Sequence, residues 1–280
     1  MIISYHPQGR LGNNIFQYIA IKVIQKYIND LYGSITYTYV YNHRTNLFGE
    51  LNFSMLYNML KNINSPSPSQ HPHSVIKSFC GSDWFFDGFY QFDYHIKDNL
   101  DYIRSLFTIY NDERINDKYT VADIVKNVYS NKVDFHPDDI ITHVRLDDFY
   151  NTSTSMIIDH KYISQIINTQ SKIYKPNEKI GNVYVVVDKI SKEYEIKYMD
   201  EFYKNTIFTT ISNSDNMFKD LAYLWFAPNL ICNNSTFCWI AYIFGNAKQT
   251  WCPKNIGLNY PQAFEKIKDD TIVYNWNTYK

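Results

Sequence analysis

The sequence predicts an α/β fold built on parallel sheets. Three observations lead to this prediction. The chain opens on a short apolar strand, a glycine turn and a helical segment; apolar segments of strand length recur through its second half; and segments with helical periodicity separate them. Strands that alternate with helices in this way are typical of a parallel sheet covered on both faces. The chain has 280 residues, which suits one large or two modest domains, and we expect two.

The first elements follow from the hydrophobic pattern. Residues 2–5 form a short apolar segment of strand type, residues 9–14 a turn, and the next stretch a helix, because its apolar residues recur at helical spacing. One face of that helix consists of Phe16, Ile19, Val23 and Tyr27. Residues 35–41 alternate in the manner of a strand. This order predicts the start of a strand–helix–strand unit.

The middle of the chain contains a proline-rich segment. Residues 63–75 include SPSPSQHPHS, which has no periodicity, so we expect a flexible surface loop there. A strand and turn are expected at residues 85–92, and helices at residues 94–107 and 119–129. We therefore assign residues 1–135 to an N-terminal domain.

The second half of the chain has the clearest alternation, and we assign residues 136–280 to a C-terminal domain. Its expected strands are residues 139–144, 182–187, 206–210, 229–233 and 249–252. Its expected helices lie near residues 160–172, 191–203, 215–226 and 235–245. A doubly wound parallel sheet is the predicted result, and ligands of such sheets bind beyond the carboxyl ends of the strands.

Composition and charge exclude several classes of function. Lysine and arginine number 27 against 28 aspartates and glutamates, so no global field draws the chain to nucleic acid or to an anionic membrane. Any anion that it binds must be held locally. The sequence has no long apolar run and no signal-peptide pattern at its start, so we expect a cytoplasmic protein without an integral membrane segment.

The four cysteines indicate neither a metal site nor a disulfide framework. They show no CxxC spacing, and none stands at zinc-ligand distance from a histidine along the sequence. We expect free, mostly buried thiols at Cys80, Cys232, Cys238 and Cys252. We also expect no metal ion and no cofactor.

The first polar cluster is NNSTF, Asn233–Phe237, between an apolar strand and an apolar helix. Ser235 stands where a helix N-cap is expected. The free amides and the positive dipole end of a helix that starts there suit a phosphate. The alternative is that these residues only cap a buried helix.

The second cluster, HVRLDD, follows the strand expected at residues 139–144. Arg145 has a planar fork that can hold a diphosphate through two hydrogen bonds. The alternative is an ion pair between Arg145 and Asp147 or Asp148. Because this cluster and Ser235 both follow strands of one predicted sheet, we favour a shared ligand site.

The third cluster is GRLGNNIFQ, residues 9–17. Its two glycines allow a tight turn, and Arg10, Asn13, Asn14 and Gln17 offer hydrogen-bonding groups. It lacks the third glycine of a dinucleotide-binding fingerprint, and the chain has no P-loop motif, so a dehydrogenase or P-loop enzyme is disfavoured. The alternative is an ordinary strand-to-helix turn.

These clusters, in this order, resemble motifs of the family 11 glycosyltransferases, the alpha-1,2-fucosyltransferase group. GRLGNNIFQY resembles that family's GRLGNQMFQY, HVRLDDF its HxRRxDY, and NNSTFCWIA its SNSTFSWWA. DGFYQFDYHI and VVVDKI are also similar to the family's GYWQSEKYF and FSDD segments. The matches run from residue 9 to about residue 245.

The resemblance implies a GT-B-like fold, in which two Rossmann-like domains face each other across a cleft. It also implies inverting transfer of L-fucose from GDP-fucose to a sugar hydroxyl, alpha-1,2 to galactose. The chain contains no Asp-x-Asp motif, so we expect activity without a divalent ion. The implied donor-binding residues are His143, Arg145, Asp148, Asp188, Asn234, Ser235, Thr236 and Phe237, with Arg145 catalytic. The implied residues for the acceptor or transferred sugar are Arg10, Gly12, Asn13 and Gln17.

Three departures from the family pattern leave alternatives open. Leu146 stands where the family commonly has a second arginine, Lys189 replaces a second acid, and Asn14 replaces a glutamine. A different nucleotide-sugar donor therefore stays open, as does an inactive glycan-binding protein of the same fold. No carboxylate stands out as the general base, and the acceptor glycan and oligomeric state are not readable from the sequence.

Overall fold

The computed structural model of the chain divides into two compact units, Met1–Asp123 and Ile124–Lys280. The division falls inside helix α6, Val121–Ser130, and the boundary expected at residue 135 lies in the segment after this helix. Each unit is described by itself. The residues described are 2–33, 36–37, 46–48, 50–63, 84–86, 90–91, 93–146, 157–173, 181–187, 190, 192–205, 210–212, 216–254 and 267–277.

The N-terminal unit is built on a four-stranded parallel sheet in the order β2-β1-β4-β3. Its strands are β1 (Ile2–Tyr5), β2 (Thr36–Tyr37), β3 (Asn46–Phe48) and β4 (Trp84–Phe86). Its helices before α6 are α1 (Leu11–Tyr32), α2 (Glu50–Ile63), α4 (Asp93–Lys97) and α5 (Leu100–Leu106). The proline-rich segment expected to be a loop lies outside the described residues, apart from its first residue, Ile63, which ends α2.

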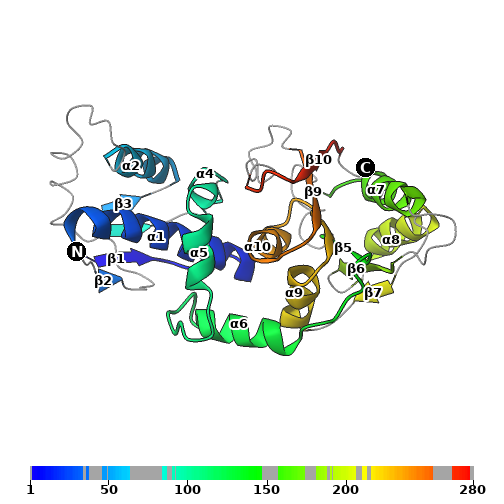
Figure 1. Cartoon of the computed structure of the whole chain (residues 1–280), viewed down its shortest axis with the longest axis horizontal. Coiled ribbons are helices and arrows are strands. Elements are labelled where there is room, and N and C mark those ends of the chain that lie inside the picture. The colour runs from blue at the N-terminus through cyan, green and yellow to red at the C-terminus, as the bar shows by residue number, and fades with distance from the viewer. Residues whose placement is uncertain are drawn as a thin grey trace. The chain divides into compact units, whose positions relative to one another are not determined.

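Helix α1 forms the core of the N-terminal unit (Figure 1) and contacts β1, α2, α4 and α5. The predicted apolar face is confirmed, since Phe16, Ile19 and Val23 are fully buried and Tyr27 nearly so. Ile15 and Ile24, on other sides of the helix, are fully buried as well. Several polar residues of the helix, Gln17 among them, are buried too, so α1 is enclosed on most sides. It ends at Gly33, whose φ of +88° is a conformation that favours glycine.

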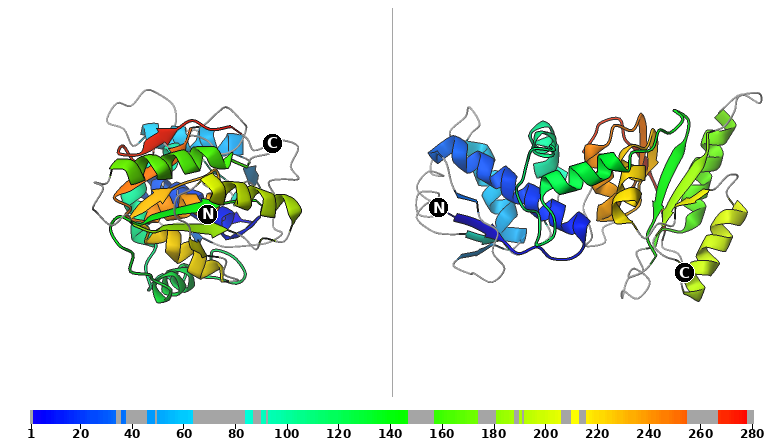
Figure 2. Two further views of the ribbon diagram at one scale, coloured as in Figure 1. Left: turned by 90° about the vertical axis from the view of Figure 1, so that its right-hand side faces the viewer. Right: turned by 90° about the horizontal axis from the view of Figure 1, so that it is seen from below.

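The C-terminal unit is built on a six-stranded parallel sheet in the order β10-β9-β8-β5-β6-β7. Its strands are β5 (Ile140–Val144), β6 (Val183–Val187), β7 (Thr210–Ser212), β8 (Asn229–Ile231), β9 (Gln249–Pro253) and β10 (Ile272–Tyr274). Its helices after α6 are α7 (His160–Ile173), α8 (Glu193–Asn205), α9 (Met217–Trp225) and α10 (Thr236–Phe244). Helices α7 and α8 cover one face of the sheet, and α9 and α10 the other, as the three views of Figures 1 and 2 show.

This strand order is that of a Rossmann fold. Counted from β5, the first three strands run outward in one direction and the last three outward in the other, so the order reverses between β5 and β8. The predicted α/β class with two Rossmann-like units is therefore confirmed. That the two units face each other across a cleft stays a prediction.

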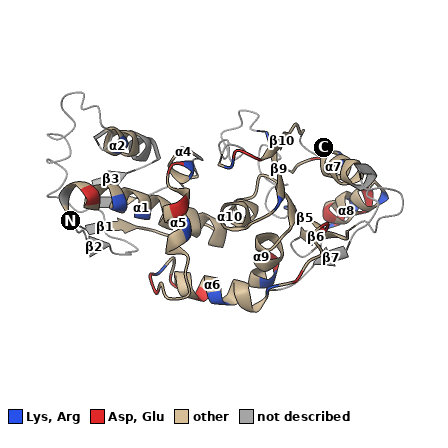
Figure 3. Cartoon of the chain, viewed as in Figure 1, with Lys and Arg blue, Asp and Glu red and all other residues tan. Residues whose placement is uncertain are grey.

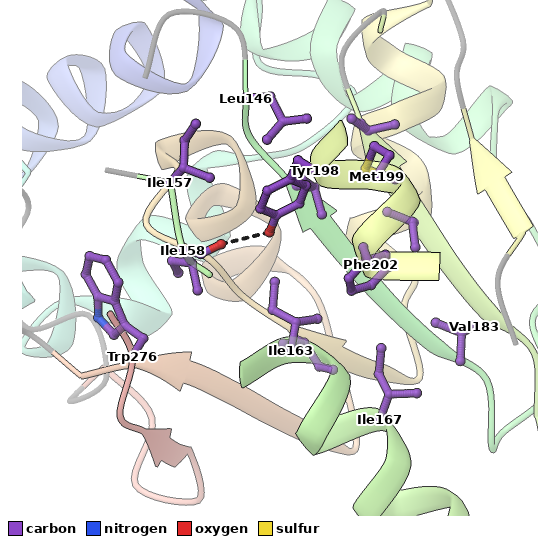
Figure 4. Close-up of a cluster of buried hydrophobic side chains, with 14 of the residues drawn as sticks. Leu146, Ile157, Ile158, Ile163, Ile167, Val183, Tyr198, Met199, Phe202 and Trp276 are labelled. Atoms are coloured by element: carbon purple, nitrogen blue, oxygen red, sulfur yellow. Dashed lines mark hydrogen bonds between the residues drawn. The ribbon is translucent and has the colours of Figure 1, made fainter. Parts of the chain in front are cut away.

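The main core of the C-terminal unit lies between the sheet and helices α7 and α8. Figure 4 shows Leu146, Tyr198, Met199 and Phe202 within this cluster. The Tyr198 hydroxyl donates a hydrogen bond of 2.8 Å to the carbonyl of Ile158, which satisfies the polar end of a buried ring. This packing fixes the sheet whose strand ends carry two of the three polar clusters.

Candidate functional site

The reversal between β5 and β8 is the point where Rossmann-like sheets bind ligands. All strand pairs of this sheet are parallel, so the carboxyl ends of β5 and β8 meet at one edge. His143 lies in β5 and Arg145 follows it directly, while Asn233–Phe237 follow β8. The structure thus brings the two C-terminal clusters to the edge that general Rossmann geometry assigns to a ligand.

Hydrogen bonds join the two strand ends. The Thr142 hydroxyl donates to the carbonyl of Ile231 at 3.2 Å, and these two residues are the last register pair of the two strands. Beyond this pair, the Asn233 side-chain amide donates to the carbonyl of His143 at 2.6 Å. Its oxygen accepts from the backbone amide of Ser235 at 2.9 Å. One buried side chain therefore fixes both the end of β5 and the approach to α10.

The start of α10 has the geometry of an anion site. Ser235 is the N-cap residue, as predicted, with φ −92° and ψ 131°, and its carbonyl accepts the first helical hydrogen bond from Trp239 at 3.1 Å. Its side chain makes no capping hydrogen bond. The amides of Phe237 and Cys238 have no acceptor within the helix, since the first turn of any helix lacks one. With the helix dipole, they favour a negative charge.

Helix α9, in the same unit, begins differently. The side-chain oxygen of its N-cap Asn216 accepts from the amides of Phe218 and Lys219, at 3.0 and 3.3 Å. Its first turn is closed by its own cap, as is usual in proteins. Helix α10 contains no charged residue (Figure 3), so only its dipole and its amides give its start a positive character.

His143 and Arg145 take different positions at the end of β5. His143 is buried, and its ring lies 5.7 Å from that of Phe237, tilted by 53°. Arg145 is half-buried and is the first residue after the strand. The predicted donor residues Asp148 and Asp188 lie outside the described residues, as does Lys189. Asn234 is buried, and Thr236 is half-buried in the first turn of α10.

Leu146 is a core residue. Its side chain is 1% exposed and belongs to the cluster formed with α7 and α8 (Figure 4). The position after Arg145 therefore points into the apolar interior of this chain, where an unpaired cation would be strongly destabilising. Packing explains why a leucine stands at the place where the family pattern has a second arginine.

Three cysteines lie in or next to the elements around the start of α10: one follows β8, one is in α10 and one is in β9. Cys232, Cys238 and Cys252 are fully buried free thiols, as predicted; Cys80 lies outside the described residues. Burial, with the proximity of the other two thiols, holds the pKa of Cys232 well above its usual range. A thiol in this environment stays protonated and unreactive. We assign these residues to packing.

The third cluster lies at the carboxyl edge of the other sheet, after β1. Gly9 has φ +75°, and a β-carbon there would clash with the Asn13 side-chain nitrogen. The Asn13 side-chain oxygen accepts from the side chain of Gln91 at 2.8 Å. Gln91 follows Tyr90, which has φ +52°, an uncommon conformation for a tyrosine. The Asn13 and Gln91 amides thus meet at this edge, and the exposed Arg10 lies at the same helix start.

The remaining predicted residues of this cluster divide into accessible and buried ones. Arg10 is exposed and is the N-cap of α1, and Gly12 is buried in the first turn. Gln17 is fully buried; its side chain donates to the carbonyl of His6 at 3.2 Å and accepts from the amide of Gln8 at 2.9 Å. The Gln17 amide therefore holds the loop between β1 and α1.

Sequence reasoning missed two residues of these edges, Asn233 and Gln91. Asn233 stands within the NNSTF motif, but the resemblance points to its neighbour Asn234. Gln91 lies in residues 85–92, where the sequence predicts a strand and turn but no site residue. Each makes a hydrogen bond to a residue more than 70 positions away, as the partners His143 and Asn13 show. Such a pairing leaves no local signal.

Within the described ranges, no group of three or more His, Cys, Asp or Glu side chains is arranged to hold a metal ion. Nor is any helix of that part of the chain long and apolar enough to cross a membrane. The predictions of a metal-independent and cytoplasmic protein stay predictions.

Comparisons with known proteins give weak likenesses. No family model and no curated protein matches the sequence. Among solved structures, a mutant of FUT1 from Arabidopsis thaliana in complex with GDP is 12% identical, with a TM-score of 0.45 over 90% of this chain and 70% of that chain. POFUT1 in complex with GDP-fucose is 11% identical, with a TM-score of 0.46 over 98% of this chain and 97% of that chain. Likenesses at these TM-scores carry no conclusion about activity.

Proposed function

We propose that the chain is a glycosyltransferase that binds a nucleoside diphosphate-sugar at the edge formed by β5 and β8. GDP-fucose is the donor that the sequence motifs favour. The proposed reaction is inverting transfer of L-fucose to a sugar hydroxyl, with an alpha-1,2 linkage to galactose, and it needs no divalent ion. Asn234, Ser235, Thr236 and Phe237 line the donor site in this proposal, together with His143, Arg145, Asp148 and Asp188.

The observation that carries the proposal is the position of Arg145 and the start of α10. They follow two adjacent parallel strands at the reversal of a Rossmann sheet. A guanidinium and the first-turn amides of a helix are both groups that bind phosphate, and both are donors only. The chain as a whole carries a formal net charge of −1, so a cationic site at this edge is a local feature.

The chemistry of sugar transfer uses such a site directly. Negative charge grows on the departing diphosphate while the sugar passes through an oxocarbenium-like state. Arg145 and the α10 amides are held in place by the sheet before the reaction begins, so they stabilise this charge without reorganising. A preorganised donor of this kind lowers the activation barrier by about 3–4 kcal/mol, which is about 10²–10³-fold in rate.

The N-terminal unit supplies the proposed side for the acceptor or the transferred sugar. Arg10, Gly12 and Asn13 lie in the turn and first helical turn after β1. The Asn13 and Gln91 amides both donate and accept hydrogen bonds, which suits sugar hydroxyls. Gln17 contributes by holding the preceding loop, because both ends of its amide are already bonded to that loop.

A nucleotide panel tests the donor assignment. Purified protein should be stabilised by GDP and not by UDP, dTDP or CDP in a thermal-shift assay, by about 2.7 kcal/mol when GDP is at about 100 times its Kd. It should also hydrolyse GDP-fucose slowly and transfer fucose to a galactose-terminated acceptor. Stabilisation by a different nucleotide would mean that the donor is a sugar of that nucleotide and not GDP-fucose. Glycan binding with no response to any nucleotide would contradict the proposal and indicate a binding protein.

Arg104→Ala is a matched control for the arginine. Arg104 is half-buried like Arg145, but it lies in helix α5 of the N-terminal unit. Its removal changes the net charge by the same amount as Arg145→Ala. Arg104→Ala should therefore leave the GDP response unchanged, whereas Arg145→Ala should abolish it in a protein that is still folded.

A further inference from the structure

Asn233 is the side chain that spans the edge between β5 and β8. It is 3% exposed and lies two residues beyond the end of β8. Both ends of its amide are used, since the nitrogen donates to the carbonyl of His143 and the oxygen accepts from the amide of Ser235. A single side chain thereby bonds both segments that lead to the candidate site.

The bond to His143 takes the place of a backbone hydrogen bond between the two strands. The backbone register between β5 and β8 ends at the pair Thr142 and Ile231. Beyond that pair, the 2.6 Å hydrogen bond from Asn233 holds the strand end that leads, two residues later, into Arg145. The side chain thus sets how far the end of β5 lies from the chain after β8.

The bond to Ser235 fixes the start of α10. A side-chain oxygen that accepts from the amide two residues ahead forms an Asx turn, which orients the chain that follows. Ser235 is itself the N-cap, so the direction of the first helical turn depends on this hydrogen bond. The amides of Phe237 and Cys238 take their direction from that turn.

We infer that Asn233 is a positioning residue, which holds Arg145 and the first-turn amides of α10 at the spacing that one diphosphate requires. The inference rests on the proposed function, because it assumes that both groups bind the same ligand. Asn233 does not itself need to touch the ligand. It acts through the carbonyl of His143 and the amide of Ser235, to which its side chain is hydrogen-bonded.

Asn229, the first residue of β8, provides a matched control. It is 8% exposed at the opposite end of β8, and its side chain donates to the carbonyls of Pro137 and Asp139, both at 2.9 Å. Asn229 therefore joins the start of β8 to the segment before β5, and Asn233 joins the chain after β8 to the end of β5. Only the Asn233 link lies at the carboxyl edge. A purely structural role would make the two residues equivalent.

The experiment compares Asn233→Ala, Asn229→Ala and wild type by Tm and by the Kd for GDP from calorimetry. Both variants should lower the Tm, because each removes a buried, doubly bonded amide. Only Asn233→Ala should weaken GDP binding, by about tenfold, by analogy with the lower end of the loss seen when a side chain that orients a metal ligand is removed. Equal GDP affinity in the two variants would overturn the inference.

Asn233→Ser separates the two hydrogen bonds. A serine hydroxyl can still accept from the Ser235 amide, but it is too short to reach the carbonyl of His143. If the link between the strand ends is what positions the site, Asn233→Ser should bind GDP as weakly as Asn233→Ala. Recovery of wild-type affinity by Asn233→Ser would contradict this role.

Nucleotide binding by wild type distinguishes failure of the proposed function from failure of the positioning role. If wild type binds neither GDP nor any other nucleotide of the panel, the proposed function fails. The positioning role is then judged by hydrogen exchange of the amides of residues 235–238. Asn233→Ala should exchange these amides faster, and Asn229→Ala should not. Equal exchange in the two variants would refute the positioning role independently of any ligand.

Discussion

The carboxyl edges of the two sheets have the same architecture and different chemistry. At each edge the strand order reverses, between β1 and β4 in one unit and between β5 and β8 in the other. At each edge a helix begins whose N-cap side chain makes no capping hydrogen bond, Arg10 for α1 and Ser235 for α10. The N-terminal edge then presents paired amides, Asn13 with Gln91, together with the exposed N-cap Arg10. The C-terminal edge presents Arg145 and a helix start.

The difference indicates which ligand each edge suits. Amide side chains donate and accept, and sugar hydroxyls do the same, so amides match them without a net charge. A guanidinium and helix amides only donate, and they match a phosphate that only accepts. In the proposed function, the same Rossmann-like plan serves a sugar at one edge, through the Asn13 and Gln91 amides, and an anion at the other. Substitutions at the two edges should accordingly have different effects.

The largest expected effect is a double dissociation between the two edges. Arg145→Ala should slow sugar transfer by about 10²–10³-fold and weaken GDP binding, because it removes a preorganised cation from the diphosphate. Asn13→Ala should leave GDP binding unchanged and raise the KM for the acceptor. Calorimetry with GDP and acceptor kinetics measure the two effects. If Asn13→Ala weakens GDP binding as much as Arg145→Ala, the edges are not specialised.

Gly9→Ala should destabilise the N-terminal unit by about 2–3 kcal/mol. An alanine at φ +75° is strained, and its β-carbon displaces the Asn13 side chain and so breaks its hydrogen bond to Gln91. Gly33→Ala is the control, since Gly33 has φ +88° but no atom within 4 Å of the place that a β-carbon would take. Denaturant unfolding should show a smaller loss for Gly33→Ala. Equal losses would mean that Asn13 is not held as described.

Acid should weaken the N-terminal unit through His95. This side chain is fully buried, and burial lowers its pKa from 6.5 to about 3, although the nearby Asp98 opposes the shift. The ring lies among the rings of Tyr57 and Tyr94, at 6.1 and 5.6 Å. The unfolded chain binds the proton and the native chain does not, so stability is full above about pH 6.5 and is lost progressively as the pH falls toward 3.

The expected loss from His95 is about 2 kcal/mol between about pH 7.5 and about pH 5. His95→Phe keeps an aromatic ring and cannot titrate, so its unfolding free energy should depend less on pH by that amount. Hydrogen exchange should place the acid-induced opening in α2 and α4, and not in the C-terminal unit. A wild type and a His95→Phe variant with the same pH dependence would exclude this role.

The smallest expected effect compares two helix starts. Asn216→Ala should cost about 1 kcal/mol of stability, because it removes the cap of α9. Ser235→Ala should cost less, since the Ser235 side chain makes no capping bond to α10. Unfolding measurements of the two variants test the claim that α10 begins without a cap of its own. A Ser235→Ala loss equal to that of Asn216→Ala would contradict it.

Much of the C-terminal unit could be predicted from the sequence, because its periodicity is strong. Strands β5, β6 and β9 and helices α7 to α10 begin and end within a few residues of their expected positions. The expected strand at 206–210 is found at Thr210–Ser212, with residues 206–209 outside the described part. Strands β3 and β10 were missed, since three residues are too few to show a period. Helix α2 was missed as well.

The residues of the site that follow strands could be predicted from the sequence, but the hydrogen bonds between distant residues could not. Arg145 and Ser235 stand at strand ends, where local patterns reveal them. Asn233 and Gln91 act through partners that are distant in sequence, and only the folded chain brings these partners together. At Leu146 the motif comparison was misleading. It treated the residue as a position of the donor site, whereas the side chain is packed in the hydrophobic core.

The most direct test of the central claim is hydrogen exchange of the whole chain with and without GDP. If the diphosphate binds between Arg145 and the start of α10, GDP should slow exchange of the amides of residues 235–238 and of the segment 140–146. The loop and helix start at residues 9–17 should be unaffected. Slowed exchange at residues 9–17, with none at 235–238, would contradict the claim and assign the nucleotide to the other sheet.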